Sequence, residues 1–314
     1  MPLTLEQYVE RLAGRTDLPW PAAPKIDPPK AKPHLAQLPI KAIMWTVYGT
    51  LVAVPQGELL FEHAHDFVTD AALDKVIKEF KMWNSMSRKP GKPSEYMREL
   101  YTKALGTLRM TGGGEAPSEK VWDDIVKKLF QKDYQFDASF YGSLNEYSRK
   151  IAYFFHASLQ GTACYRGGGR ALQSVAAAGL VQGLCGDGQS FTAVQLQRSL
   201  DAEDGGVRLD DLIPEDLRVL SCEVRGKKPS DRLFRAALEA LAAKGIEPPE
   251  VLHVGSRMDK DLIPAKRLGL RTALFASDRA ALSATPEQLK DPATRPDVLL
   301  TKLKQIADVV SGEW

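Results

Sequence analysis

This sequence of 314 residues has few cysteines, a small net charge and no long apolar runs. Its three cysteines, Cys164, Cys185 and Cys222, lie far apart and show no metal-ligand spacing. An odd number of cysteines also makes a poor disulfide framework, so we expect a reducing, cytoplasmic location. No stretch is long enough to span a bilayer, and no apolar run near the N-terminus resembles a signal peptide.

The charges are almost balanced. There are 42 basic and 40 acidic residues, which gives a formal net charge of +2. This balance argues against a nucleic acid or an anionic membrane as partner, because both select a strongly basic surface. The 44% hydrophobic and 26% charged residues are typical of a globular protein.

Proline is concentrated in residues 1–38, which we interpret as an N-terminal arm. Residues 5–12 suit a short helix, but six prolines follow between positions 19 and 33. Each proline fixes φ and removes a backbone donor, so the rest of the arm is expected to be extended, either wrapping a surface or mobile.

Residues 55–167 are predicted to form an all-helical insert. Apolar residues recur at three- and four-residue spacing over residues 61–82, 94–108, 118–132 and 143–159. Segments rich in glycine and proline separate the helices at 88–93 and 111–117.

The remaining chain, residues 39–54 and 168–314, predicts a doubly wound, Rossmann-like α/β core. Short apolar strands are expected at 40–45, 180–184, 218–221, 251–254, 272–275 and 298–300. Helices are expected between them, at 171–178, 191–200, 230–244 and 261–268, with a terminal one at 301–310. This alternation indicates a parallel sheet, whose ligands bind at the carboxyl ends of the strands. The loops after Trp45, Leu184, Ser221 and Val254 are therefore candidate walls of a site.

Four of these loops carry motifs in a familiar order. Residues 45–51 read Trp-Thr-Val-Tyr-Gly-Thr-Leu, and residues 179–188 read GLVQGLCGDG. Residues 226–229 are Gly-Lys-Lys-Pro, and residues 253–261 read HVGSRMDKD. In order, spacing and context this set resembles the four motifs of the haloacid dehalogenase superfamily, over residues 40–54 and about 168–280. The resemblance implies a HAD-like core with the helical insert as its cap.

The resemblance also exposes a missing nucleophile. In the family the first-motif acid attacks the substrate and forms a covalent ester, and this position is Thr46 here. A hydroxyl needs a base to become nucleophilic, and no proton acceptor is expected beside it. The first acid of motif four is Ser256, so a Mg²⁺ site is disfavoured and no metal ligand is assigned. Tyr48 and Ser256 match the metal-free dehalogenase branch, whereas no branch explains Thr46.

Other positions leave alternatives open. Gly186 stands where the second motif has a hydroxyl, and it and Gly188 either offer N–H groups to an anion or form a turn. Asp187 either lies in the site or caps the next helix. Lys228 and Asp261 match the family's catalytic positions, and they either bind a ligand or pair with each other.

Three hypotheses follow. The leading one is a pseudoenzyme that keeps the fold, loses covalent chemistry at Thr46 and binds a small anion or molecule between core and cap, without a cofactor. The second is an active hydrolase, phosphatase- or dehalogenase-like, that uses Asp187 or Asp261, with Mg²⁺ entering only in this case. The third is a non-catalytic module that binds a protein partner the sequence does not identify.

Overall fold

The computed structural model describes residues 1–86, 92–111, 115–203 and 205–310. By their internal contacts they form two compact units. The helical unit comprises Met1–Ala22, Leu60–Gly161 and Gln189–Val194, and the α/β unit comprises Ala23–Leu59, Thr162–Gly188 and Gln195–Trp314. No helix in the described residues is long and apolar enough to cross a membrane.

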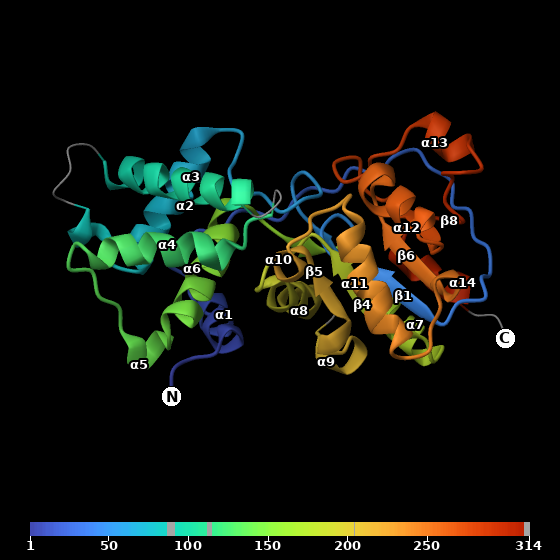
Figure 1. Ribbon diagram of the computed structural model, residues 1–314, viewed down its shortest axis with the longest axis horizontal. Coiled ribbons are helices and arrows are strands. Elements are labelled where there is room, and N and C mark those ends of the chain that lie inside the picture. The colour runs from blue at the N-terminus through green and yellow to red at the C-terminus, as the bar shows by residue number, and fades with distance from the viewer. Residues whose placement is uncertain (87–91, 112–114, 204, 311–314) are drawn as a thin grey trace. The chain divides into compact units, whose positions relative to one another are not determined.

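The α/β unit is built on a six-stranded parallel sheet in the order β5-β4-β1-β6-β7-β8 (Figure 1). Its strands are β1 (Ala42–Trp45), β4 (Val181–Gly186), β5 (Arg218–Leu220), β6 (Val251–Gly255), β7 (Arg271–Phe275) and β8 (Val298–Leu300). All six lie where the sequence predicts strands, and the parallel, doubly wound fold class is confirmed. Strand order reverses beside β1, so the site is expected at the carboxyl end of β1.

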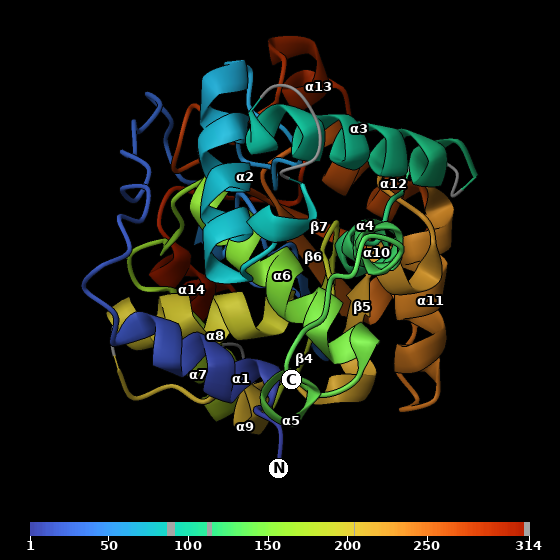
Figure 2. The ribbon, with the colours of Figure 1, turned by 90° about the vertical axis from the view of Figure 1, so that its left-hand side faces the viewer.

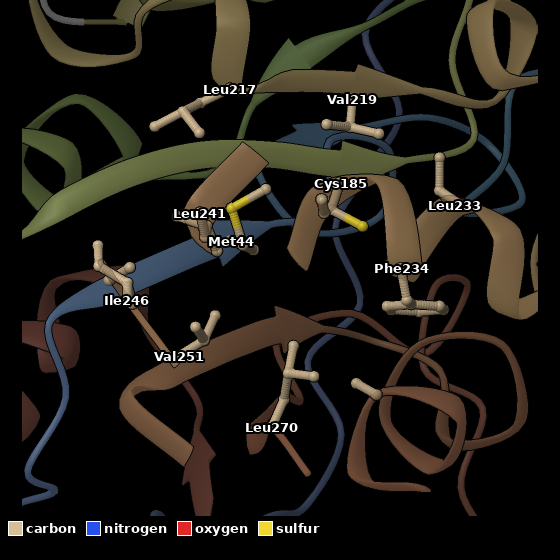
Figure 3. Packing of buried hydrophobic residues seen from close by; sticks show 13 residues of the cluster. Met44, Cys185, Leu217, Val219, Leu233, Phe234, Leu241, Ile246, Val251 and Leu270 are labelled. Carbon is tan, nitrogen blue, oxygen red and sulfur yellow. The ribbon is translucent and has the colours of Figure 1, made fainter. Parts of the chain in front are cut away.

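Helices cover both faces of this sheet. On one face, β-strand residues such as Met44 and Cys185 pack against Phe234 and Leu241 of α11 (Asp231–Ala242) (Figure 3). The same buried cluster includes Ala265 of α12 (Ile263–Arg267). The other face carries α7 (Gly168–Ala177), whose Leu172 carbonyl accepts a hydrogen bond from the Gln182 amide. Because side chains alternate along a strand, Met44 faces α11 while its neighbours face α7.

The unit also contains α8 (Thr192–Glu203), apart from its first three residues, which belong to the helical unit. Four short helices complete the list: α9 (Leu209–Leu212), α10 (Ser221–Val224), α13 (Pro286–Lys290) and α14 (Ile306–Val310). A separate antiparallel pair joins β2 (Val52–Ala53) to β3 (Ala163–Cys164).

Two predicted helices differ from the structure. The helix expected over 261–268 is a π-helical turn, Met258–Leu262, followed by α12. Pro264 accounts for the change, because it lacks the N–H with which a continuous helix would bond to Lys260. The terminal helix expected over 301–310 begins as a 3₁₀ turn, Leu303–Gln305, and becomes α14.

The helical unit confirms the four predicted helices: α2 (Asp66–Glu79), α3 (Pro93–Thr111), α4 (Ser118–Phe130) and α6 (Leu144–Leu159) (Figure 2). The short helix α5 (Ala138–Tyr141) precedes α6. The core of the unit is aromatic, with the Phe155 ring 4.8 Å from Tyr101 and 5.4 Å from Trp122. The breaks predicted at 88–93 and 111–117 lie partly outside the described residues.

The N-terminal arm is divided between the two units. Its helix α1 (Leu5–Ala13) starts with a capping box at Thr4 and belongs to the helical unit. The segment from Ala23 onward is extended along the α/β unit, where His34 pairs with Leu299 of β8 in an isolated antiparallel bridge. The part of the arm from Ala23 to Leu38 is therefore extended over a surface, which is one of the two alternatives that its prolines predict.

Candidate functional site

The motif residues converge at the carboxyl ends of three adjacent strands. Thr46 directly follows β1, Gly186 ends β4 and Gly255 ends β6. The backbone N–H of Thr46 donates to the Val254 carbonyl at 2.9 Å, which extends the pairing of β1 with β6 by one residue. Parallel strands end at the same edge of a sheet, so the first, second and fourth motifs meet there.

Three buried side chains form the centre of the site. The Lys228 ammonium donates to Asp261 Oδ1 at 2.6 Å and to Thr46 Oγ1 at 2.8 Å. The Thr46 hydroxyl in turn donates to Asp261 Oδ1 at 3.3 Å. All three side chains lie in buried residues. Lys228 and Asp261 therefore form an ion pair with each other, which is one of the two alternatives given for them above.

The Asp261 carboxylate is saturated with donors. Its second oxygen, Oδ2, accepts the backbone N–H groups of Ser256 at 3.1 Å and Arg257 at 3.0 Å. Burial raises the pKa of this carboxyl, but the Lys228 charge and these hydrogen bonds outweigh it and leave the pKa below its usual value. Gly255 makes the approach possible, because a Cβ there would lie 2.5 Å from Asp261 Cβ.

A fourth member of the cluster, His253, was not predicted. Its Nε2 lies 3.3 Å from Thr46 Oγ1 and 3.4 Å from Lys228 Nζ. It aligns with Met44 across the β1–β6 pairing, so it faces α11, where its ring contacts Phe234. The strand alternation was the available signal, since it places residues 253 and 255 on one face.

His253 and Asp261 correct the expectation that no proton acceptor lies beside Thr46. Both acceptors are weak bases. Burial and the Lys228 charge lower the pKa of His253 to about 3, so the imidazole is neutral near pH 7. A base with so low a pKa draws little on the proton of an alcohol.

Asp187 and Gly188 both form hydrogen bonds to other parts of the α/β unit. Asp187 Oδ1 accepts the backbone N–H of Lys228 at 2.8 Å, which ties the second motif to the third. The Gly188 N–H donates to Ser221 Oγ at 3.0 Å and thus is bonded to the protein. A Cβ at Gly186 would meet only ordinary contacts, at 3.5 Å from the Val47 nitrogen and 3.7 Å from Thr46 Cγ2. The sheet therefore leaves room for a Cβ at this position.

Tyr48 and Ser256 lie beside the cluster. The Tyr48 hydroxyl donates to Gln195 Oε1 of α8 at 2.6 Å. The Ser256 hydroxyl is buried and has no hydrogen-bond partner in the described residues. A Cβ at Gly49 would lie 2.9 Å from this hydroxyl oxygen, so the first-motif turn closes over Ser256.

The donor set does not fit Mg²⁺. Thr46 and Ser256 supply neutral hydroxyls, and both Asp261 oxygens already accept hydrogen bonds. The described residues contain no group of three or more His, Cys, Asp or Glu side chains arranged to hold a metal. Lys228 already neutralises the Asp261 carboxylate, so this carboxylate offers little negative charge to a cation.

Comparisons with known proteins agree with the motifs. Residues 225–306 match a family model described as HAD-hydrolase-like. The Rhythmically expressed gene 2 protein of Drosophila melanogaster is 37% identical over 59 residues, 19% of this chain and 23% of that protein. A glyceraldehyde 3-phosphate phosphatase of Methanopyrus kandleri is 32% identical over 92 residues, 29% of this chain and 36% of that protein. The chain thus aligns with well under half the length of these curated relatives.

A haloacid dehalogenase and a HAD phosphatase of known structure also have folds similar to that of this chain. The L-2-haloacid dehalogenase from Xanthobacter autotrophicus is 20% identical and superposes with a TM-score of 0.44, covering 88% of this chain and 100% of that chain. A HAD phosphatase from Thermococcus onnurineus is 17% identical with a TM-score of 0.44, covering 87% and 99%. The family model over residues 225–306, the parallel sheet and the motif residues at its strand ends together support membership of this chain in the HAD-like superfamily.

Proposed function

We propose that this chain is a HAD-like protein that has lost covalent hydrolysis and keeps a role in binding a small anionic ligand. The observation that carries the proposal is Thr46 Oγ1 at the nucleophile position, hydrogen-bonded to Lys228 and Asp261. The family's chemistry requires a carboxylate there, which is ionised at neutral pH without help.

The charges of the cluster support the loss of covalent hydrolysis. Lys228 is balanced by Asp261, and His253 is neutral near pH 7. A ligand that draws on the Lys228 charge has to compete with an ion pair in which both side chains are almost fully buried. This arrangement holds the strand ends together and gives little driving force for attack on a substrate.

The test is a panel of phosphate monoesters and 2-haloacids, assayed with and without Mg²⁺. We expect the wild type to give no turnover above the rate without enzyme. Mg²⁺-dependent hydrolysis that Thr46→Ala abolishes would overturn the proposal. Binding of the same compounds is measured in parallel by calorimetry, and a complete lack of binding would contradict the ligand role.

Restoring the missing groups provides a complementary test. The variant Thr46→Asp places a carboxylate beside the Lys228 ammonium, and Gly186→Ser adds the second-motif hydroxyl where the sheet has room for a Cβ. With Ser256→Asp as a third change, Mg²⁺ gains a second new carboxylate. We expect hydrolysis to appear in the combined variant and to be absent from the wild type.

A second candidate function, an active hydrolase, is favoured by one observation. Asp261 Oδ1 lies 3.3 Å from Thr46 Oγ1, within reach of the proton that a threonine nucleophile would lose. An adduct trapped on Thr46, Asp261 or Asp187 and located by mass spectrometry would establish this function. Turnover that survives Thr46→Val but not Asp261→Asn would instead indicate an activated water.

A further inference from the structure

A cavity of about 770 Å³ lies within the α/β unit. It is bordered by Ala276 after β7, Thr301 after β8, the start of α7 and the extended arm. None of Thr46, Lys228, His253 and Asp261 is among the described residues that line it. Its volume is within the range of about 300–1,000 Å³ that is typical of small-molecule sites.

The lining of this cavity is strongly cationic. Among the described residues that line it are the cations Arg166, Arg170, Lys302 and Lys304, together with one carboxylate, that of Glu203. Glu203 Oε1 accepts the backbone N–H of Gly167 at 2.8 Å, so this carboxylate is tied to the cavity wall. The whole chain has 42 basic and 40 acidic residues, so this excess of positive charge is local. Such a local excess attracts anions.

The four cations come from two segments far apart in the sequence. The segments adjoin, because a Cβ at Gly167 would lie 3.8 Å from Lys304 Cβ. Gly167 has a φ of 81°, which turns the chain into α7 immediately after Arg166. The start of α7 also carries the positive end of the helix dipole, although the N–H groups of Gly167 and Gly168 already donate to Glu203 Oε1 and to the Tyr165 carbonyl.

The arm supplies an apolar wall. Ile26, Pro28 and Pro29 line the cavity, and Asp27 between them is held at two points. Its backbone N–H donates to buried Asp278 Oδ1 at 3.2 Å, and its carbonyl accepts the Arg279 N–H at 2.8 Å. This side of the cavity is therefore fixed by hydrogen bonds to the α/β unit.

We propose that this cavity binds a phosphorylated small molecule, with the phosphate among the four cations and the organic body against the arm. Guanidinium groups match phosphate oxygens with paired hydrogen bonds, and lysines add point charges. The prolines and Ile26 provide a dry surface for an apolar or aromatic body. This site is separate from the Thr46 cluster and does not depend on whether that cluster is catalytic.

Calorimetry at low ionic strength tests the proposal with phenyl phosphate and inorganic pyrophosphate as probes. We expect saturable binding of phenyl phosphate, weakened by roughly tenfold or more in Arg166→Ala/Lys304→Ala, because two charge-assisted contacts are lost. The matched control is Arg267→Ala/Lys290→Ala, which removes two exposed cations from α12 and α13. Affinity in the control is expected to stay within about twofold of the wild type.

Two outcomes would overturn the proposal. The first is no saturable binding of either anion to the wild type. The second is an equal loss of affinity in the cavity and control variants, which would indicate attraction to surface charge in general. Pyrophosphate binding as tightly as phenyl phosphate would remove the role assigned to the apolar wall. Hydrogen exchange supplies a second measurement, with slower exchange expected at the start of α7 when phenyl phosphate is bound.

Discussion

Lys228 and Asp261 are joined by an ion pair with an Nζ–Oδ1 distance of 2.6 Å, and only 2% and 3% of their side chains are exposed. Two charges that have left water together stabilise each other, but either one alone is costly in the interior. The stability of the strand ends therefore depends on both partners being present.

The first prediction is that Asp261→Asn destabilises the protein strongly. The variant leaves the Lys228 ammonium buried without its counter-ion, which costs about 3–5 kcal/mol. Urea unfolding measures this loss. The control is Asp216→Asn, whose partner Lys244 is partly exposed, and it is expected to cost less than about 1 kcal/mol. Equal losses in the two variants would contradict the assigned role of the buried pair.

The second prediction separates the hydroxyl of Thr46 from its shape. Thr46→Val keeps the volume but removes the acceptor of a 2.8 Å hydrogen bond from Lys228, at a cost of about 1–3 kcal/mol. Thr46→Ser keeps the oxygen and is expected to be clearly less destabilising. Chemical denaturation of both variants tests this order. A Thr46→Val protein as stable as the wild type would show that the hydroxyl contributes nothing to folding.

The third prediction concerns pH. The pKa of His253 falls to about 3 in the folded state, from about 6.5 in an unfolded chain. Below pH 6.5 the unfolded chain binds a proton that the folded protein does not, so stability falls as the pH drops toward 3. His156, buried in the helical unit, also has a pKa of about 3 and acts in the same direction. Asp261, whose pKa is below its usual value, adds a loss only at lower pH.

Unfolding free energies measured at pH 7, 6, 5 and 4 test this dependence. We expect a decline that approaches about 1.4 kcal/mol per pH unit for each of the two histidines. His253→Gln is expected to reduce the slope, because it removes one of the two histidines whose pKa is lowered in the folded state. A slope that is the same in wild type and His253→Gln would show that this imidazole does not stay neutral.

The fourth prediction compares two glycines in the motif loops. Gly186→Ser is expected to cause no backbone clash, since a Cβ at this position meets only ordinary contacts. Gly255→Ser forces a Cβ to 2.5 Å from Asp261 Cβ and is expected to cost several times more. Thermal unfolding of the two variants compares their losses of stability. A larger loss for Gly186→Ser than for Gly255→Ser would contradict the packing described.

The fold was largely predictable from local patterns. Helices α2, α3, α4 and α6 follow from apolar spacing because each buries one stripe of its surface. The strands follow from short apolar runs between turns, since a parallel sheet is covered on both faces. Pro264 lies where the π-turn changes to α12. Apolar spacing alone does not reveal this change, because it takes no account of the backbone N–H that a proline lacks.

The candidate site was only partly predictable. Motif order identified Thr46, Lys228 and Asp261, and the structure brings these three together. His253 was missed because it lies inside a strand, where its contacts depend on the register between β1 and β6. The bond from the Lys228 backbone to Asp187 joins segments far apart in the chain, which a pattern within one segment does not reveal.

The arm also bears on how copies of this protein behave toward one another. β8 is the last strand in the sheet order, and an open strand edge offers its backbone groups to any other extended chain. Here His34 and Leu299 exchange two backbone hydrogen bonds, of 2.9 and 2.8 Å, so part of that edge is already satisfied from within. By occupying part of the β8 edge, the proline-rich segment reduces the number of backbone groups through which two copies could pair edge to edge. This effect does not depend on the chemistry at the Thr46 cluster.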